Sequence, residues 1–298
     1  MRTQINTEGA IVLERSRFAD YIALTKPELT FLSVVTAMAG FYLGTTGGIP
    51  VMLMLHVLVG TGLVGAGAGA LNMYIERDYD AMMRRTENRP LPSGRLSPRE
   101  VLWFGSTLSL VGITELLLFT NLLTGFLAIA TLTTYLFLYT PLKRITPLAT
   151  IVGAVPGALP PVMGWTAACN EITLDTWILF AILFLWQMPH FLSLAWMYRR
   201  DYMRAGYRLM TVSDENGSTT SGHILAYCLA LIPVTIIPAA LGLFGLIYLL
   251  GTIALGLGFF YLSLRYRFDR SNHTARQVFF ASLLYLPALL LVMVVDKI

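Results

Sequence analysis

The feature that most constrains this chain is a series of apolar stretches, each long enough to cross a lipid bilayer. A transmembrane helix needs about 20 mainly apolar residues, and the sequence supplies nine such stretches. Only 13% of the residues are charged, whereas soluble proteins carry about 25%. We therefore predict an all-α membrane protein with nine transmembrane helices. The predicted spans are 21–44, 51–76, 100–119, 121–141, 147–167, 173–198, 223–243, 245–265 and 276–295.

Lysines and arginines gather in alternate connections between these spans, which indicates the orientation. Six arginines lie within 77–99, whereas Lys297 is the one basic residue expected on the opposite side. The positive-inside rule then places the N-terminus in the cytoplasm and the C-terminus outside. The other cytoplasmic cations are Arg2, Arg15, Arg17 and Lys26 before the first span, Lys143 and Arg144 after the fourth, Arg199, Arg200, Arg204 and Arg208 after the sixth, and Arg265, Arg267, Arg270 and Arg276 after the eighth.

The first twenty residues form the predicted cytoplasmic N-terminal segment of a single transmembrane domain, 1–298. They are polar and mixed in charge, so they do not resemble a cleavable signal peptide. They also contain Glu8, Glu14 and Asp20, unlike an acid-poor mitochondrial transit peptide. We therefore expect a multi-pass protein of a bacterial inner membrane. Cys169 and Cys228 lack the spacing of a disulfide framework or a zinc site.

The end of the second span carries a dense group of polar side chains in the run Asn72-Met-Tyr-Ile-Glu76-Arg-Asp78-Tyr-Asp80. If the helix continues, Asn72, Glu76 and Asp80 share one stripe, since residues four apart lie on the same face. Asp78 then points to the opposite side. Magnesium takes one or two carboxylates and leaves its other positions to water and phosphate oxygens, and arginine forks bind phosphate bidentately. The pattern therefore suits a Mg²⁺-bridged phosphate ester.

A simpler interpretation is a solvated helix end followed by a topology-determining basic loop. A second polar group at the end of the sixth span argues against it. His190 and Asp201 are eleven residues apart, so a continuous helix would place them on one face. A lone histidine in an apolar helix is more often a hydrogen-bonded core residue, and Asp201 among arginines also suits an interfacial ion-pair cluster. Ionisable groups inside a membrane are nevertheless functional candidates.

A third motif, Tyr139-Thr-Pro-Leu-Lys143-Arg144, follows the fourth span. Its two cations are either topology anchors or ligands of a leaving phosphate. Together the motifs resemble those of the UbiA superfamily of intramembrane prenyltransferases, and are most similar to its haem-modifying branch. The resemblance covers nearly the whole chain and is carried by 72–92, 139–144, 153–161 and 186–191.

Two motifs place the chain within that superfamily. Glu76 takes the first acid position of the general motif, and Asp80 takes the second. In the second motif His190 stands where most of the superfamily has aspartate, and only Asp201 is kept. The haem-modifying branch looks like this too, which favours it over the quinone-forming members.

The resemblance implies transfer of the farnesyl group of farnesyl diphosphate to the vinyl group of haem B, with addition of water, to give haem O and pyrophosphate for a terminal oxidase. It implies Mg²⁺ held through Asn72, Glu76 and Asp80. The implied diphosphate-binding residues are Asn72, Arg85, Arg89, Tyr139, Lys143 and Arg144. The implied catalytic residues are Asp80, Lys143, His190 and Asp201, with His190 a haem contact, a general base, an axial ligand or a structural residue.

The implied partners are farnesyl diphosphate, haem B and the lipid bilayer, with haem A synthase or oxidase assembly proteins as candidate protein partners and no nucleic acid. Two alternatives stay open on the sequence. One is a related prenyltransferase acting on an aromatic quinone precursor, and the other is a transporter or lipid-binding protein. Glycine- and proline-broken helices fit transporters as well, but a transporter site is expected near the bilayer midplane, whereas both polar groups here lie at one membrane face.

Overall fold

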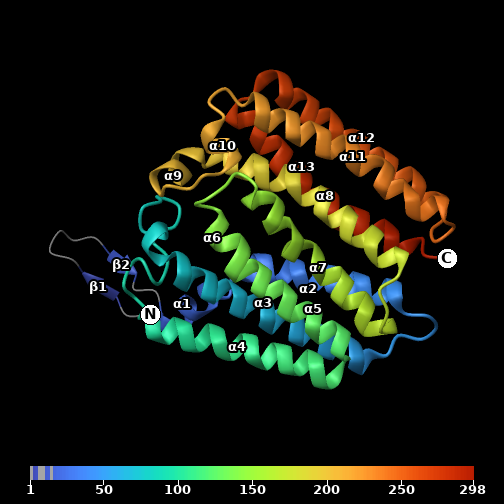
Figure 1. Ribbon diagram of the computed structural model, residues 1–298, viewed down its shortest axis with the longest axis horizontal. Coiled ribbons are helices and arrows are strands. Elements are labelled where there is room, and N and C mark those ends of the chain that lie inside the picture. Colours follow the sequence, from blue (N-terminus) through green and yellow to red (C-terminus); the bar gives the residue numbers. More distant parts are fainter. Residues whose placement is uncertain (1–2, 6–10, 14–15) are drawn as a thin grey trace.

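The computed structural model describes residues 3–5, 11–13 and 16–298, and this part of the chain is almost entirely helical (Figure 1). Eight helices are long and apolar enough to cross a membrane, and the bent pair α1–α2 supplies a ninth span. Within the described residues this confirms the predicted fold class and the order of the spans. The elements are α1 Arg17–Leu24, α2 Pro27–Gly44, α3 Val51–Asp80, α4 Pro98–Phe119, α5 Leu122–Thr133, η1 Thr134–Tyr139, α6 Thr140–Leu142, α7 Ala149–Cys169, α8 Leu174–Met197, α9 Arg199–Arg204, α10 Met210–Ser213, α11 Ser218–Ala240, α12 Leu246–Asp269 and α13 Asn272–Val295.

The spans pack around α7 and α8, which are the most buried of the set. On one side α8 contacts α11 and α13, and the largest apolar core lies among these helices and α12. On the other side α7 contacts α2 and α5, while α3 packs along α4 (Figure 1). Aromatic and branched apolar side chains fill the first core, and smaller clusters join α2, α3, α4, α5 and α7.

The long connections meet at one end of the bundle, where α6, α9 and α10 lie (Figure 1). There the Arg208 amide donates to the Lys143 carbonyl over 2.8 Å, which joins the connection after α8 to the one after α6. At the opposite end the Lys297 ammonium donates to the carbonyl oxygens of Tyr42 and Thr45, each over 2.8 Å. The longest connections between the spans therefore all lie at the end of the bundle that holds α6, α9 and α10.

The first span differs from the prediction because it is not one straight helix. The two helices α1 and α2 meet at an angle of 46°, and Lys26 between them has φ of 46° in the left-handed region. Pro27 follows, and a proline disfavours the α conformation of the residue before it. The Lys26-Pro27 pair therefore breaks the helix.

Two further local features were not predicted. The fourth span contains a π-helical turn, η1, and such turns often occur at functional sites. Ahead of α1, strands β1 Thr3–Ile5 and β2 Ile11–Leu13 pair antiparallel, with Gln4 opposite Val12. Arg2, Glu8, Glu14 and Arg15, which the sequence interpretation used, lie outside the described residues.

Close backbone contact between α2 and α7 leads to a stability prediction. A Cβ atom at Gly164 would overlap the Ala37 carbonyl oxygen, which belongs to a backbone that cannot move alone. Gly164→Ala is expected to lower the free energy of unfolding by about 1–3 kcal/mol, the usual cost of overpacking a core. Denaturant unfolding in detergent would measure it. Gly258→Ala is the matched control, since a Cβ there meets nothing within 4 Å, and equal stability of the two variants would contradict the prediction.

Candidate functional site

Three polar side chains on the last turns of α3 form a buried stripe, which we call the acidic stripe: Asn72, Glu76 and Asp80. The helix continues through Asp80, as predicted, so residues four apart share a face. The exposed fractions are 1% for Asn72, 6% for Glu76 and 1% for Asp80. The side chain of Asp78, on the opposite side, is 77% exposed. Burial of two carboxylates is unfavourable unless cations and hydrogen bonds compensate for it, and the neighbouring connections supply both.

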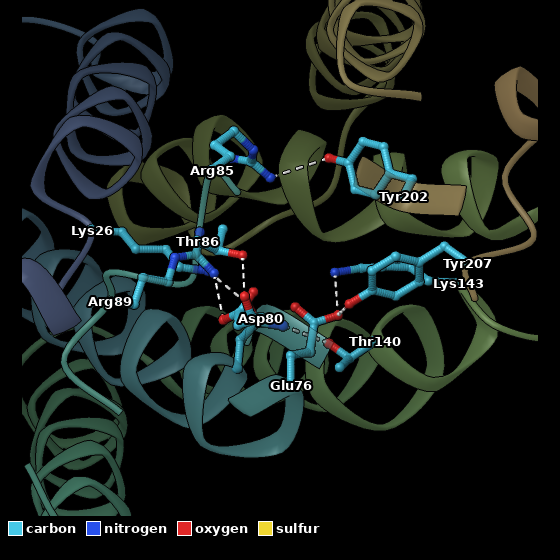
Figure 2. Close-up of polar contacts among 11 residues, drawn as sticks. Lys26, Glu76, Asp80, Arg85, Thr86, Arg89, Thr140, Lys143, Tyr202 and Tyr207 are labelled. Carbon is cyan, nitrogen blue, oxygen red and sulfur yellow. Dashed lines mark hydrogen bonds and ion pairs between the residues drawn. The ribbon is translucent and has the colours of Figure 1, made fainter. Parts of the chain in front are cut away.

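Glu76 is held from the connections after α6 and α9. Its Oε1 accepts from the Lys143 ammonium over 2.7 Å and from the Tyr207 hydroxyl over 3.0 Å (Figure 2). Burial alone would lower the pKa of Lys143, but the Glu76 carboxylate outweighs it and holds that pKa well above its ordinary value. Burial and the same carboxylate raise the pKa of Tyr207, so its hydroxyl keeps the proton that it donates. The second oxygen of Glu76 has no hydrogen-bond partner among the described residues.

Asp80 is held from its own connection, 81–97. Its Oδ2 accepts from Arg89 Nη1 over 2.6 Å, and its backbone carbonyl accepts from the Thr86 hydroxyl over 2.8 Å (Figure 2). The connection therefore folds back over the end of α3 and places a guanidinium beside the carboxylate.

Asn72 is oriented from two other spans. The Lys26 ammonium donates to Asn72 Oδ1 over 2.6 Å, and Asn72 Nδ2 donates to the Thr140 hydroxyl over 3.1 Å. Thr140 in turn donates to the Tyr135 carbonyl over 2.8 Å across the π-helical turn. This chain of hydrogen bonds fixes which end of the amide faces Lys26.

The remaining predicted phosphate ligands lie around this centre. Arg85 donates to the Tyr202 hydroxyl over 3.4 Å (Figure 2), and Arg144 stacks 4.2 Å from the Tyr79 ring centroid. The Tyr139 ring lies 4.5 Å from the Lys143 ammonium. Gly153 makes room for that ring, because a Cβ there would overlap it. The sequence-predicted phosphate residues are therefore gathered at the end of α3.

The charge at this centre favours an anionic ligand. Three basic side chains, Lys26, Arg89 and Lys143, contact the acidic stripe, which carries two carboxylates, and Arg85 and Arg144 lie around them. In the part of the chain that the structure describes, no group of three or more His, Cys, Asp and Glu side chains could hold a metal by itself. Two carboxylates that each keep one oxygen without a partner among the described residues do fit Mg²⁺ that draws its other ligands from water and phosphate.

His190 and Asp201 are placed differently from the prediction. Helix α8 ends at Met197 and Tyr198 leaves the helical conformation, so the expectation that one continuous helix puts them on one face is wrong. Asp201 lies on α9 and pairs with Arg204 over 3.3 Å. His190 is 8% exposed and its Nδ1 lies 2.8 Å from Ser282 Oγ on α13. Neither side chain contacts the acidic stripe directly, and their assigned roles stay predictions.

Sequence reasoning missed two side chains of this centre, Lys26 and Tyr207. The helix-breaking Lys26-Pro27 pair was a visible signal, since a cation at a break between helices can reach into the bundle. Tyr207 gave no signal, because its contact with Glu76 bridges 131 positions of the chain. Arg95, by contrast, pairs with Asp20 over 2.9 Å and stabilises the loop away from the stripe.

Comparison with known proteins finds one family over most of the chain. The model of the UbiA prenyltransferase family matches residues 33–284. A protein of Solibacter usitatus named protoheme IX farnesyltransferase is 46% identical over 287 residues, covering 93% of this chain and 98% of the relative. One of the same name from Myxococcus xanthus is 45% identical over 284 residues, covering 94% of this chain and 95% of the relative.

Solved structures show the same fold at lower identity. A structure described as digeranylgeranylglyceryl phosphate synthase in membranes aligns with a TM-score of 0.78 at 17% identity, covering 94% of this chain and 98% of the other. A UbiA homolog from Archaeoglobus fulgidus, bound to DMAPP and Mg²⁺, aligns with a TM-score of 0.65 at 14% identity, covering 92% of this chain and 99% of the other. The helical arrangement is thus shared well beyond the range of close sequence similarity.

Proposed function

This chain belongs to the UbiA prenyltransferase family, and from that premise we propose that it is a protohaem IX farnesyltransferase. It transfers the farnesyl group of farnesyl diphosphate to a vinyl group of haem B, with addition of water, and yields haem O and pyrophosphate. The observation that carries the proposal is the buried acidic stripe and the basic side chains that contact it, in a chain 36–46% identical to several relatives of that name.

The acidic stripe suits the diphosphate head of the first substrate. Glu76 and Asp80 would hold Mg²⁺, and the bound ion would offset the negative charge of the diphosphate. Asn72 would be a third ligand of the metal through Oδ1, the oxygen that accepts from the Lys26 ammonium. The Archaeoglobus fulgidus homolog bound to DMAPP and Mg²⁺, which shares the fold, supports the use of Mg²⁺ with a prenyl diphosphate.

The surrounding cations would stabilise the diphosphate as it leaves. As the allylic carbon–oxygen bond breaks, its electron pair goes to the diphosphate, whose negative charge grows. Lys143 and Arg89 lie where they would stabilise that charge, and Arg85, Arg144 and Tyr139 lie around them. Groups already aimed at a developing charge lower the barrier most, because they need no reorganisation during the reaction.

The second half of the reaction takes place on haem. The farnesyl cation is attacked by the vinyl double bond of haem B, which forms the new carbon–carbon bond and leaves a cation beside the ring. Water adds to that carbon and loses a proton, which gives the hydroxyethylfarnesyl side chain. We assign His190 to the haem end of the site and Asp201 to its cytoplasmic rim, where it would act with the neighbouring arginines.

The placement in the cell follows from the same proposal. We place the protein in a bacterial inner membrane as a single transmembrane domain, with residues 1–20 and the acidic stripe on the cytoplasmic side and the C-terminus outside, because the basic connections gather at one end. Haem A synthase or oxidase assembly proteins would receive the product.

The test uses purified protein in nanodiscs with haem B, farnesyl diphosphate and Mg²⁺, followed by mass analysis of the haem. We expect a gain of one farnesyl group and one water, together with released pyrophosphate, and loss of both when EDTA removes the metal. Unchanged haem, with pyrophosphate released only when an aromatic acceptor is added, would move the protein to the quinone-precursor enzymes. If folded protein releases no pyrophosphate with either haem B or the aromatic acceptor, the result would favour a transporter or lipid-binding protein.

A second prediction concerns Lys26, which forms no salt bridge with a carboxylate among the described residues. Its partly buried ammonium donates to the Asn72 amide over 2.6 Å, so it is available for a phosphate oxygen. Lys26→Met is expected to lower kcat/KM for farnesyl diphosphate by about 10- to 100-fold, the usual worth of a hydrogen bond to a charged group. Arg17→Gln is the control, because that cation lies on α1 with a 68% exposed side chain paired to Glu100. Equal kcat/KM values for the two variants would show that Lys26 does not bind the diphosphate.

A further inference from the structure

His190 is fixed by a second helix in a way that the proposed chemistry has not used. Its Nδ1 lies 2.8 Å from the hydroxyl oxygen of Ser282, and four residues earlier on α8 Trp186 Nε1 donates to the Ser282 carbonyl over 2.8 Å. The imidazole is also stacked against the rings of Trp186 and Phe279, at centroid distances of 5.6 and 4.7 Å. One residue of α13 therefore fixes two residues of α8.

The single hydroxyl proton of Ser282 decides the direction of the hydrogen bond to His190. Ser282 Oγ donates to the Phe279 carbonyl over 2.6 Å, and a serine hydroxyl has only one hydrogen to give. Toward His190 it therefore offers a lone pair, so Nδ1 must be the donor. Ser282 is fully buried, and no water-exposed alternative competes for that hydroxyl.

A protonated Nδ1 leaves a lone pair on Nε2 of the neutral ring. This nitrogen points away from Ser282 and has no hydrogen-bond partner among the residues that the structure describes. A histidine that ligates a metal usually has its other ring nitrogen donating to such an acceptor, which fixes the tautomer and raises the basicity of the ligand. The arrangement at His190 matches that requirement.

We propose that Ser282 is a positioning residue that holds His190 as the Nδ1–H tautomer, so that Nε2 serves as an axial ligand of the haem iron. The inference rests on the proposed function in one respect, that haem is the second substrate. It goes beyond that function by naming the residue that sets the tautomer and the atom that meets the iron. Ligation at Nε2 would hold the porphyrin in one position while its vinyl group reacts.

The first test measures the tautomer in the protein without haem. The chain has four histidines, so ¹⁵N-histidine labelling in nanodiscs gives few signals, and the His190→Gln spectrum identifies those of His190. We expect the protonated nitrogen to be Nδ1 in the native chain and Nε2 in Ser282→Ala, with Ser282→Thr restoring Nδ1. A native chain protonated at Nε2 would overturn the proposal without the need for any variant.

The second test measures the iron–histidine stretching band of bound ferrous haem by resonance Raman spectroscopy. We expect the band in the native chain, its loss in His190→Gln, and about 10- to 100-fold weaker haem binding in Ser282→Ala, as for other lost partners of metal-bound histidines. Ser263→Ala is the matched control, since that buried serine donates to Phe259 and contacts Cys228 between α11 and α12. A band that persists in His190→Gln, or equal haem affinity in Ser282→Ala and Ser263→Ala, would overturn the proposal.

Product analysis on the same preparation separates this inference from the proposed function. Haem O formed by a native chain whose His190 is protonated at Nε2 would leave the enzyme assignment standing and remove the role of Ser282. Absence of haem O would count against the enzyme assignment, and the tautomer measurement would still decide whether Ser282 orients His190.

Discussion

Asp80→Asn is expected to lower kcat for farnesyl transfer by at least about 10²–10³-fold, the usual cost of losing one preorganised stabilising group, while the protein stays folded. Asp80 is 1% exposed, and the oxygen that does not face Arg89 has no hydrogen-bond partner among the described residues. Asparagine keeps the shape and one acceptor oxygen but removes the charge that would hold Mg²⁺ against the diphosphate. The measurement is single-turnover haem O formation, with thermal unfolding in detergent as the check on the fold.

Asp78→Asn is the matched control, since it makes the same chemical change two residues away on the same helix. Its carboxylate is 77% exposed and lies 3.7 Å from Arg77, on the face of α3 opposite to the stripe. We expect it to keep close to native activity. Native activity in Asp80→Asn, or equal losses in the two variants, would mean that the stripe does not hold the metal.

The contrast between these two aspartates shows what sequence alone could predict. Helical periodicity separates Asp80 from Asp78 with no knowledge of the neighbouring spans, and the structure buries the first and exposes the second as expected. The spans could be predicted for a similar reason, because the cost of exposing polar backbone in lipid forces each long apolar stretch into a helix.

The features that could not be predicted from the sequence depend on tertiary contacts or on a local break in a helix. The shared face of His190 and Asp201 assumed a helix that in fact ends at Met197, and periodicity has no meaning across that break. Tyr207 reaches Glu76 from a connection far along the chain, and Ser282 meets His190 across 92 positions. Such pairings arise from how the spans pack, which the pattern of one sequence does not encode.

Lys143→Met is the second substitution expected to have a large effect, with kcat/KM lower by about 10²–10³-fold. The Lys143 ammonium lies 2.7 Å from Glu76 and 4.5 Å from the Tyr139 ring centroid, and its side chain is 11% exposed. Methionine keeps the length and the packing of the side chain but removes the charge that would stabilise the leaving diphosphate. The measurement is farnesyl transfer and pyrophosphate release, and Arg276→Gln, near the start of α13, should leave both unchanged.

The raised pKa of Lys143 also predicts how activity depends on pH. Burial lowers the pKa of Lys143, but the Glu76 carboxylate raises it well above the ordinary 10.5, so the ammonium stays charged across the neutral and mildly alkaline range. Because this pKa is raised on folding, its contribution to stability is complete below pH 10.5 and is lost only as the pH rises through the higher folded value. We therefore expect no alkaline loss of activity from Lys143 between pH 7 and about 10. A Lys143→Met variant that is less stable but reacts at the native rate would show that Lys143 only neutralises Glu76.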